Sequence, residues 1–488
     1  MIRTLTAYPA YKDSGVEWLG KVPEHWEVRR LKRIARLNPS KSEVPLAMRN
    51  DPAVFLSMER VGSDGRFDAS EVRPISAIWN GFTYFRRGDV IVAKITPCFE
   101  NGKGACLRNL PTSVGFGSTE FHVIRPLAAV TPSYLYRVTT LSEFRWLGAD
   151  EMTGAAGQQR VPAEFMANFL IPFPPLPEQT AVVRFLDWAD RRVRRVIRTR
   201  QRRIKLLEEY KQALIHQAVT GQIDVRTGQP YPTYKDSGVE WLGDVPAHWE
   251  VLPGRTVFRE INDRGHPDEQ MLSVTIIGGV IRQADLLADS FKKDSSNEDK
   301  SNYKLVQPGD LVYNKMRAWQ GAVGVSTYRG IVSPAYIVQR LRSADNLPCY
   351  MHFLLRIPLF ASEAERWSYG ITSDQWSLRA EEFKCIYFSL PPLPEQTAIA
   401  EHLDAQTAKI DAAISASRRE IDLLREYRTR LIADVVTGKV DVREVAARLP
   451  EGPHEEEAEW MDTEEIAESE TADDDVAAEA LSEEEVEP

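Results

Sequence analysis

The chain has 488 residues, of which 27% are charged and 43% hydrophobic, a composition typical of a globular protein with roughly two to four domains. No run of about 18 apolar residues is present, which excludes a membrane-spanning helix, and the N-terminus lacks the apolar core of a signal peptide, so we expect a cytoplasmic protein. The formal net charge is −10, but residues 451–488 hold eighteen acidic side chains and no Lys or Arg, so the remaining chain carries 61 basic against 53 acidic residues and suits a polyanion.

The first predicted element is a phrase at residues 11–28 that recurs at residues 234–251. Sixteen of its eighteen residues are identical in the two copies. Each copy carries two tryptophans and a histidine, namely Trp18, His25, Trp26 and Trp241, His248, Trp249. Because no Ser, Cys or acid partner for the histidine recurs at a useful spacing, we favour core packing against the helix ends over a catalytic role.

A variable block follows each phrase, at residues 29–170 and 252–387. Alternating apolar residues after Gly-Asp turns predict strands in both, at 53–58, 86–95, 118–124, 270–277, 306–316 and 334–341. Helices are predicted at 132–147 and at 349–367, where Pro358 interrupts the pattern. Each block is expected to be a compact α+β domain, although its strand order cannot be derived from the sequence.

Each block ends in the motif PPLPEQTA, at residues 174–181 and 391–398, and a long helix is predicted to begin there. Apolar residues recur at heptad spacing in both helices, with Arg200 and Ser417 at the odd positions; they are Leu186, Val193, Ile197, Ile204, Leu207, Leu214 and Leu403, Ile410, Ile414, Ile421, Leu424, Leu431. Gly221 and Gly438 are stop signals, so each helix has roughly 40 residues, or about 60 Å.

A narrow apolar seam of this length needs a partner. Antiparallel pairing of the two helices would place the two variable domains at opposite ends, whereas in the alternative each helix packs on its own domain. The seam is of the two-sided coiled-coil kind, which favours the antiparallel pair.

The cysteines and the acidic tail carry less information. Cys98, Cys106, Cys349 and Cys385 form no C-x-x-C pair, so free, partly buried thiols are expected rather than a zinc site or disulfide framework. The tail has the composition of a disordered, solubilising segment. The alternative is a mimic of phosphate charge that competes for the basic surface of the body.

The repeated phrase, the PPLPEQTA hinge, the heptad helix ending in VTG and the doubling of the whole set resemble the specificity subunit of type I restriction-modification systems, over about 430 of the 488 residues. The resemblance implies an α+β fold in which two target recognition domains are separated by a pair of long antiparallel coiled-coil helices, as a pseudo-two-fold tandem repeat. The domains would be 1–173 and 227–390, the helices 174–226 and 391–443, and an acidic disordered tail 444–488.

The resemblance also implies a function. Each recognition domain would read one half of a split, asymmetric site in double-stranded DNA, with half-sites about 34 Å apart. The helices would serve as spacer and as docking surface for two methyltransferase subunits, which restriction subunits then join. S-adenosylmethionine and ATP are expected on those partners, and the acidic tail is not part of the family pattern.

Base reading requires Arg, Lys, Asn or Gln side chains that reach the groove edges. In the first block we select residues on the 86–95 segment and on the small-residue loop TGAAGQQR, namely Lys94, Lys103, Gln158, Gln159 and Arg160. In the second block the corresponding segments supply Lys315, Arg317, Gln320, Ser373 and Gln375. For each of these residues a merely solvated surface position is the alternative. Trp319 and Trp376 are expected to be core residues rather than stacking platforms.

The first long helix is unusually basic, with ten Arg or Lys between Arg184 and Lys205. The cluster Arg191, Arg192, Arg194 and Arg195 predicts a stripe that follows the DNA backbone, with an ordinary solvated helix face as the alternative.

We expect no catalytic, cofactor or metal site in this chain. GVEWLGK (15–21) resembles a phosphate loop, but Val22 replaces the Ser or Thr and the second copy has Asp244 in place of the Lys. Asp89 and Lys94 are spaced as in a nuclease core, as are Asp310 and Lys315, but the second acid of such a core is missing. Two alternatives remain: a self-sufficient nuclease or methyltransferase, which these absences disfavour, and a pure assembly scaffold whose variable blocks bind proteins.

Overall fold

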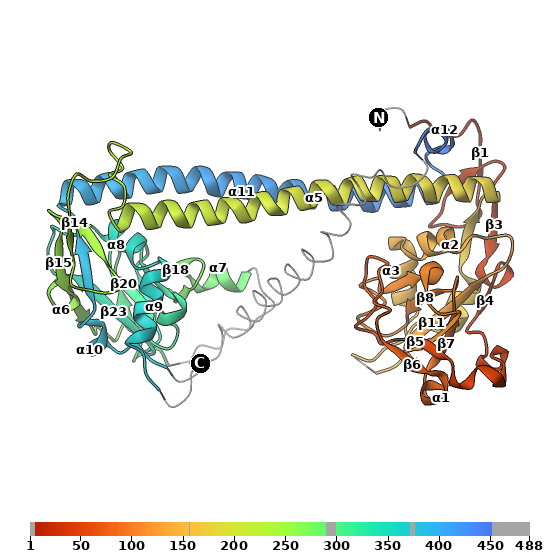
Figure 1. Cartoon of the computed structure of the whole chain (residues 1–488), viewed down its shortest axis with the longest axis horizontal. Coiled ribbons are helices and arrows are strands. Elements are labelled where there is room, and N and C mark those ends of the chain that lie inside the picture. The colour runs from red at the N-terminus through yellow and green to blue at the C-terminus, as the bar shows by residue number, and fades with distance from the viewer. Residues whose placement is uncertain (1–4, 156, 289–298, 371–375, 451–488) are drawn as a thin grey trace. The chain divides into compact units, whose positions relative to one another are not determined.

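The computed structural model describes residues 5–155, 157–288, 299–370 and 376–450 (Figure 1). Its contacts divide the described chain into two compact units. Unit 1 joins residues up to 200 with residues 419–450, and unit 2 is residues 201–418. The first unit is therefore closed by the C-terminal part of the chain.

Unit 1 consists of short strands and small helices, to which the two long helices described below contribute their adjoining ends. Its strands are β1 (Tyr11–Asp13), β2 (Lys21–Pro23), β3 (Glu27–Arg30), β4 (Ala35–Leu37), β5 (Pro52–Leu56), β6 (Val72–Pro74), β7 (Thr83–Arg86), β8 (Val90–Ala93), β9 (Gly104–Cys106), β10 (Val114–Gly117), β11 (Phe121–Pro126) and β12 (Leu170–Phe173). Its helices are η2 (Leu31–Arg33), η3 (Lys41–Glu43), η4 (Leu46–Asn50), α1 (Ile75–Ile78), η5 (Leu107–Asn109), α2 (Pro132–Thr139), α3 (Ser142–Asp150), α4 (Ala163–Asn168) and α12 (Arg443–Ala447).

The sheets of unit 1 have the strand orders β6-β5-β10-β7 and β4-β11-β8-β9. Only the β5–β10 pair is parallel within these two sheets of the described chain. All four residues of β8 are buried, which explains its continuous apolar run. Helix α2 packs against that strand, and its Tyr134 and Leu135, also fully buried, share a core with Val90 and Val92.

The predicted helix 132–147 is wrong as a single element, because the chain forms α2 and α3 instead. The hydroxyls of Thr139 and Thr140 donate to the carbonyls of Tyr136 and Arg137, each at 2.7 Å. These side chains compete with helix propagation, and Leu141 turns to extended backbone and enters the core.

Unit 2 repeats this plan with different lengths. Its strands are β13 (Tyr234–Asp236), β14 (Asp244–Pro246), β15 (Glu250–Pro253), β16 (Phe258–Ile261), β17 (Leu272–Thr275), β18 (Gly279–Arg282), β19 (Lys304–Val306), β20 (Leu311–Asn314), β21 (Val323–Val325), β22 (Gly330–Val332), β23 (Tyr336–Leu341) and β24 (Tyr387–Leu390). Its helices are α6 (Gly254–Val257), α7 (Gln283–Ala288), η6 (Ala318–Gln320), α8 (Pro348–Leu354), α9 (Pro358–Arg366) and α10 (Ala380–Phe383). The break predicted at Pro358 is confirmed, since this proline opens α9.

The largest sheet in the described part of unit 2 has the order β16-β23-β20-β21, with smaller pairs β15-β24, β17-β18 and β19-β22. The strands predicted in both blocks are confirmed in position, with β8, β11, β20 and β23 at the centre of their sheets.

Two long helices, α5 (Leu176–Val219) and α11 (Leu393–Val436), are shared between the units. Each has 44 residues, which corresponds to about 66 Å. In unit 1 the start of α5 packs against the end of α11, where Leu186 and Ala189 share a core with Leu431 and Val435. Asp190 pairs there with Arg428, and Arg200 with Glu420 at 2.8 Å.

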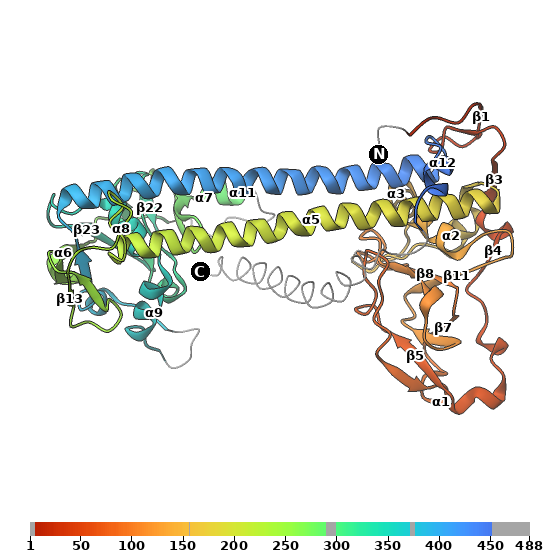
Figure 2. The ribbon, with the colours of Figure 1, turned by 45° about the horizontal axis from the view of Figure 1, so that its top comes forward.

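In unit 2 the end of α5 packs against the start of α11. Ile215 and Val219 share a core with Ile399 and Leu403, and Lys211 pairs with Asp411 at 2.7 Å. The helices lie side by side within each unit in both views (Figure 1 and Figure 2). These contacts confirm the antiparallel pair and exclude helices that each pack on their own domain alone.

The constant phrase fastens to both helices of its unit. Glu178, in the first turn of α5, accepts hydrogen bonds from Trp26 Nε1 at 2.8 Å and from Tyr8 at 3.3 Å, and its other oxygen lies 2.6 Å from His25 Nε2. A Cβ at Gly438, which ends α11 with a φ of +78°, would lie 2.5 Å from Pro23. The expected packing against the helix ends is therefore confirmed for Trp26, whereas His25 is exposed and contributes its contact with Glu178 instead.

The second copy makes the same contacts in unit 2. Glu395 accepts from Trp249 Nε1 at 2.7 Å and from Tyr231 at 2.5 Å, with His248 Nε2 at 3.0 Å. The residue after each glutamate binds the variable block, because Gln179 accepts from Thr131 N at 2.8 Å and Gln396 from Leu347 N at 2.7 Å.

The predicted start of the tail at residue 444 is wrong. Residues 443–447 form α12, Ala446 and Leu449 are buried in the core of unit 1, and the carbonyl of Leu449 accepts a hydrogen bond from Arg184. The acidic residues 451–488 lie outside the described chain. In the described part no helix is long and apolar enough to cross a membrane. The four cysteines are free as predicted; three are partly buried, but Cys349 is exposed.

Candidate nucleic-acid interface

Two loops of unit 1 bring together most of the residues that were predicted to contact DNA in the first variable block. One loop follows β8 and begins at Lys94, and the other follows α3 and ends at Arg160. They are joined by backbone hydrogen bonds from Val161 N to Lys94 O at 2.8 Å and from Thr96 N to Gln159 O at 3.0 Å. Lys94, Gln158, Gln159 and Arg160 therefore share one surface.

Arg160 is held by a carboxylate of its own unit. Its guanidinium donates two hydrogen bonds to Glu120, each at 2.9 Å, and a third to Gln158 O at 3.1 Å. The Arg160 guanidinium lowers the pKa of the Glu120 carboxyl, and the carboxylate raises the pKa of Arg160. This bidentate pair shapes the loop, so Arg160 positions the exposed Gln158.

A buried histidine supports the same loop from below. His122 on β11 lies with Nε2 2.8 Å from Val161 O and Nδ1 3.3 Å from the Asn38 amide. Burial lowers the pKa of His122, so the neutral ring donates from Nε2 and accepts at Nδ1.

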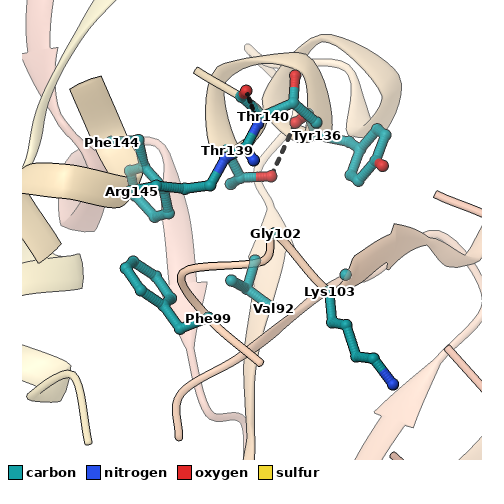
Figure 3. A pocket seen from close by; sticks show the side chains of 10 residues that line it. Val92, Phe99, Gly102, Lys103, Tyr136, Thr139, Thr140, Phe144 and Arg145 are labelled. Atoms are coloured by element: carbon teal, nitrogen blue, oxygen red, sulfur yellow. Dashed lines mark hydrogen bonds between the residues drawn. The ribbon is translucent and has the colours of Figure 1, made fainter. Parts of the chain in front are cut away.

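Lys103 stands on the far end of the first loop. Its Nζ donates to the carbonyl of Met58 at 3.3 Å, which directs it toward the turn after β5. A small pocket lies behind this loop, lined by residues of the loop and of α2 and α3 (Figure 3). Arg145 points into it and donates to Thr140 O at 2.7 Å, while Lys103 points away from it (Figure 3).

The pocket leaves no room for a side chain on the loop. A Cβ at Gly102, whose φ is +75°, would lie 2.8 Å from Arg145 Nη1. Burial lowers the pKa of Arg145. We therefore interpret the pocket as packing that supports the loop rather than as a ligand site.

Unit 2 has an equivalent pair of loops. The segment after β20 begins at Lys315, whose carbonyl accepts from Leu378 N at 2.8 Å, as Lys94 accepts from Val161. The bridge between Tyr369 and Ser377 corresponds to that between Thr153 and Arg160. Ser373 and Gln375 lie between these bridge residues, outside the described chain.

The remaining predicted residues of unit 2 lie on the segment that contains η6. Lys315, Arg317 and Gln320 are all partly buried. Trp319 donates to Met316 O at 2.9 Å and packs edge-on against Trp376, with centroids 5.6 Å apart. Both tryptophans are partly buried, so they are not fully core residues as predicted; they join the two loops.

The acids with nuclease-like spacing have a structural partner. Asp89 is buried and receives two hydrogen bonds from Arg125, both at 2.8 Å, and Asp310 receives two from Arg340 at 2.6 and 2.8 Å. Each pair fastens a Gly-Asp turn to a central strand of its sheet, β11 in unit 1 and β23 in unit 2. Within the described residues, no group of three His, Cys, Asp or Glu could hold a metal ion.

Comparison with known proteins identifies the kind of protein that this chain resembles. Residues 23–206 match the family model for the Type I restriction modification DNA specificity domain. The Type I restriction enzyme EcoAI specificity subunit of Escherichia coli is 38% identical over 167 residues, 33% of this chain and 28% of that protein, so the match spans less than a third of that relative. The chain therefore resembles type I specificity subunits, and its match to the family model covers residues 23–206.

Two other relatives extend over the whole repeat. The Putative type I restriction enzyme MjaX specificity subunit of Methanocaldococcus jannaschii is 22% identical over 447 residues, 87% of this chain and 96% of that protein. A chain in a solved structure on complex assembly and conformational transition of the type I R-M system has a TM-score of 0.62 at 19% identity, covering 85% of this chain and 98% of that chain. This likeness shows a shared fold of α+β domains and long paired helices.

The basic cluster on α5 is not uniform. Arg194 pairs with Asp190 at 3.1 Å and with Asp64 at 2.9 Å, and so joins the helix to the first block. Burial works to raise the pKa of Asp64, but hydrogen bonds from Arg194 and from the Arg66 amide lower it overall. Arg192 and Arg195 are exposed, and Arg191 is partly buried.

Sequence analysis missed the residues that hold these loops. Glu120 and His122 lie on or beside β11, about 40 residues before the loop they support, and no local pattern joins the two segments. Glu178 and Glu395 were detectable, because the same acid and the same His-Trp pair recur in both copies.

Proposed function

We propose that this chain is the non-catalytic DNA-recognition subunit of a type I restriction-modification complex. Each unit would read one half of a bipartite, asymmetric site in double-stranded DNA. Methylation and cleavage would be carried out in the cytoplasm by partner subunits, which would bind S-adenosylmethionine and ATP.

One observation carries the proposal. Equivalent pairs of loops stand on equivalent frames, joined by the same backbone bond at Lys94 and Lys315, yet their side chains differ. Unit 1 presents Gln158 and Gln159, whereas unit 2 presents Arg317 and Gln320 with two tryptophans. The same backbone arrangement of loops, carrying different polar side chains in the two units, is suited to recognising two different half-sites.

The long helices offer equivalent surfaces to two copies of one partner. Leu206 on α5 is 55% exposed, and its equivalent on α11, Leu423, is 64% exposed. Tyr210, one turn after Leu206, is also exposed. Repeated apolar residues on a solvent-facing helix are typical of a protein interface, so we assign these positions to the two methyltransferase subunits. Restriction subunits would join that core.

Gel-shift assays on a pool of random duplexes test the proposal. The chain is assayed alone and with its methyltransferase subunits, and bound duplexes are sequenced. A specificity subunit enriches a split sequence when the methyltransferase is present. An assembly scaffold, the alternative function, enriches none in either case.

A further inference from the structure

The turn between β17 and β18 carries the most exposed of the large hydrophobic side chains in the described chain. Ile277 is 91% exposed, while Leu272 and Val274 of β17 are buried beneath the same hairpin. A single exposed apolar residue is common on protein surfaces and indicates nothing by itself. Ile277 differs from such a residue in the hydrogen bonds that hold its turn in place.

A partly buried arginine, Arg356, holds the turn from its inner side. Arg356 Nη2 donates to the carbonyls of Ile276 and Ile277, at 2.8 and 2.5 Å, and Nη1 donates to Val323 O at 2.8 Å. Desolvation lowers the pKa of Arg356, so its charge is held at a cost that these carbonyl contacts offset. The Thr275 hydroxyl accepts from Gly278 N at 2.9 Å and closes the turn.

The backbone of the turn is also closely packed against its neighbours. A Cβ at Gly279, whose φ is +64°, would lie 2.9 Å from Arg356 Nη1, and one at Gly324 would lie 3.1 Å from Gly279 Cα. With the carbonyls turned inward, the side chain of Ile277 is presented outward on a rigid support. A rigid support for an apolar tip is what a recognition contact requires.

The turn adjoins the candidate interface of unit 2. Arg356 links it to β21, the strand that follows the segment from Lys315 to Gln320. A Cβ at Gly321, directly after that segment, would lie 3.9 Å from Ile276 Cγ2. The hairpin and the polar segment therefore form one continuous surface.

We propose that Ile277 is a base-reading residue, whose side chain contacts the 5-methyl group of a thymine in the major groove of the half-site that unit 2 reads. The proposal rests on the function proposed above. The major groove admits a two-stranded ribbon, and apolar side chains read the thymine methyl there. Arg356 would be the positioning residue for this contact.

The test uses the chain assembled with its methyltransferase subunits and the target found by sequencing. Each thymine of the target is replaced in turn by deoxyuridine, which differs only by the missing methyl group. For the wild type we expect one replacement to weaken binding roughly three- to five-fold, the value of one buried methyl contact. For Ile277→Ala that replacement should have no effect, and Ile277→Val should retain part of it.

Leu46→Ala is the matched control, since Leu46 is 77% exposed on η4 of unit 1. It should leave the response to this replacement as in the wild type. Sequence-selective binding in which no replacement depends on Ile277, or a target without a thymine at such a position, would overturn the inference while leaving the proposed function intact. A lower melting temperature for Ile277→Ala would assign the residue to packing and would also overturn it. Loss of all sequence preference in the wild type would instead contradict the proposed function.

Discussion

At the scale of single residues, carboxylates and not the predicted cations organise the candidate interface. Glu120 orients Arg160 by two charge-assisted bonds, and Arg160 in turn holds the backbone of Gln158. Arg160 was predicted to contact bases, and three of its hydrogen bonds are made within the unit. The side chain of Gln158 is left to face the solvent.

Glu120→Gln should therefore impair reading without preventing DNA binding. Loss of the bidentate pair frees the loop, and we expect roughly ten-fold weaker discrimination at the half-site read by unit 1. Competition gel shifts against duplexes altered in one half-site measure this. Glu164→Gln, an exposed acid on α4, is the control. Equal loss of discrimination at both half-sites would show a general defect and not a loop effect.

A second residue-scale prediction concerns acid stability. Burial works to raise the pKa of Glu395, but hydrogen bonds from Tyr231, His248 and Trp249 lower it overall. Because the folded pKa lies below the unfolded value of about 4.3, this stabilisation is fully present above that pH and is lost as pH falls through the folded pKa. The free energy of unfolding should therefore fall below about pH 4.

Glu395→Gln should reduce this acid sensitivity, and should lower stability at neutral pH by about 1–3 kcal/mol. Urea unfolding followed from pH 3 to 7 provides the comparison, with the exposed Glu401→Gln on α11 as control. A variant that keeps the wild-type dependence on pH would show that Glu395 is not the titrating anchor.

At the scale of elements, the two long helices were predictable and the order of the strands in the sheets was not. Proline marks the start and glycine the end of α5 and α11, and the heptad pattern marks the face on which the two helices meet. These features were predictable because each depends on residues close together in the sequence. The order β6-β5-β10-β7 joins strands up to about 60 residues apart, which no local pattern specifies. The candidate interface was predictable in part for the same reason. The similarity of the Lys94 and Lys315 segments located the loops, but the residues that hold these loops lie on strands far away in the sequence.

The basic cluster of α5 gives a prediction at this scale. If its exposed members follow the DNA backbone, Arg192→Ala with Arg195→Ala should reduce the slope of log affinity against log salt by about 0.9 for each phosphate that the variant no longer neutralises. Arg194→Ala is the internal comparison, since its ion pairs with Asp64 and Asp190 assign it to stability. An unchanged slope in the double variant would assign the stripe to protein contacts.

At the scale of the whole molecule, duplication explains why one phrase is kept and the following blocks differ. Each copy of the phrase fastens to the start of one long helix and the end of the other, through Glu178 and Gly438 in unit 1 and Glu395 and Gly221 in unit 2. A substitution in the repeated phrase would weaken its contacts with the two helices, whereas a substitution in a loop would alter only the DNA sequence that is recognised. Two independent readers joined by paired helices should recognise two half-sites with a fixed gap.

The most direct test of this account alters the helices and leaves both readers untouched. Four residues are inserted after Arg200 and four after Ser417, so that both helices lengthen by about 6 Å. Modified adenines are then mapped across the genome of a host that carries the variant and its partner subunits. We predict the same two half-sequences as for the wild type, with a gap longer by about one or two base pairs. The wild-type gap retained between unchanged half-sequences would contradict the account.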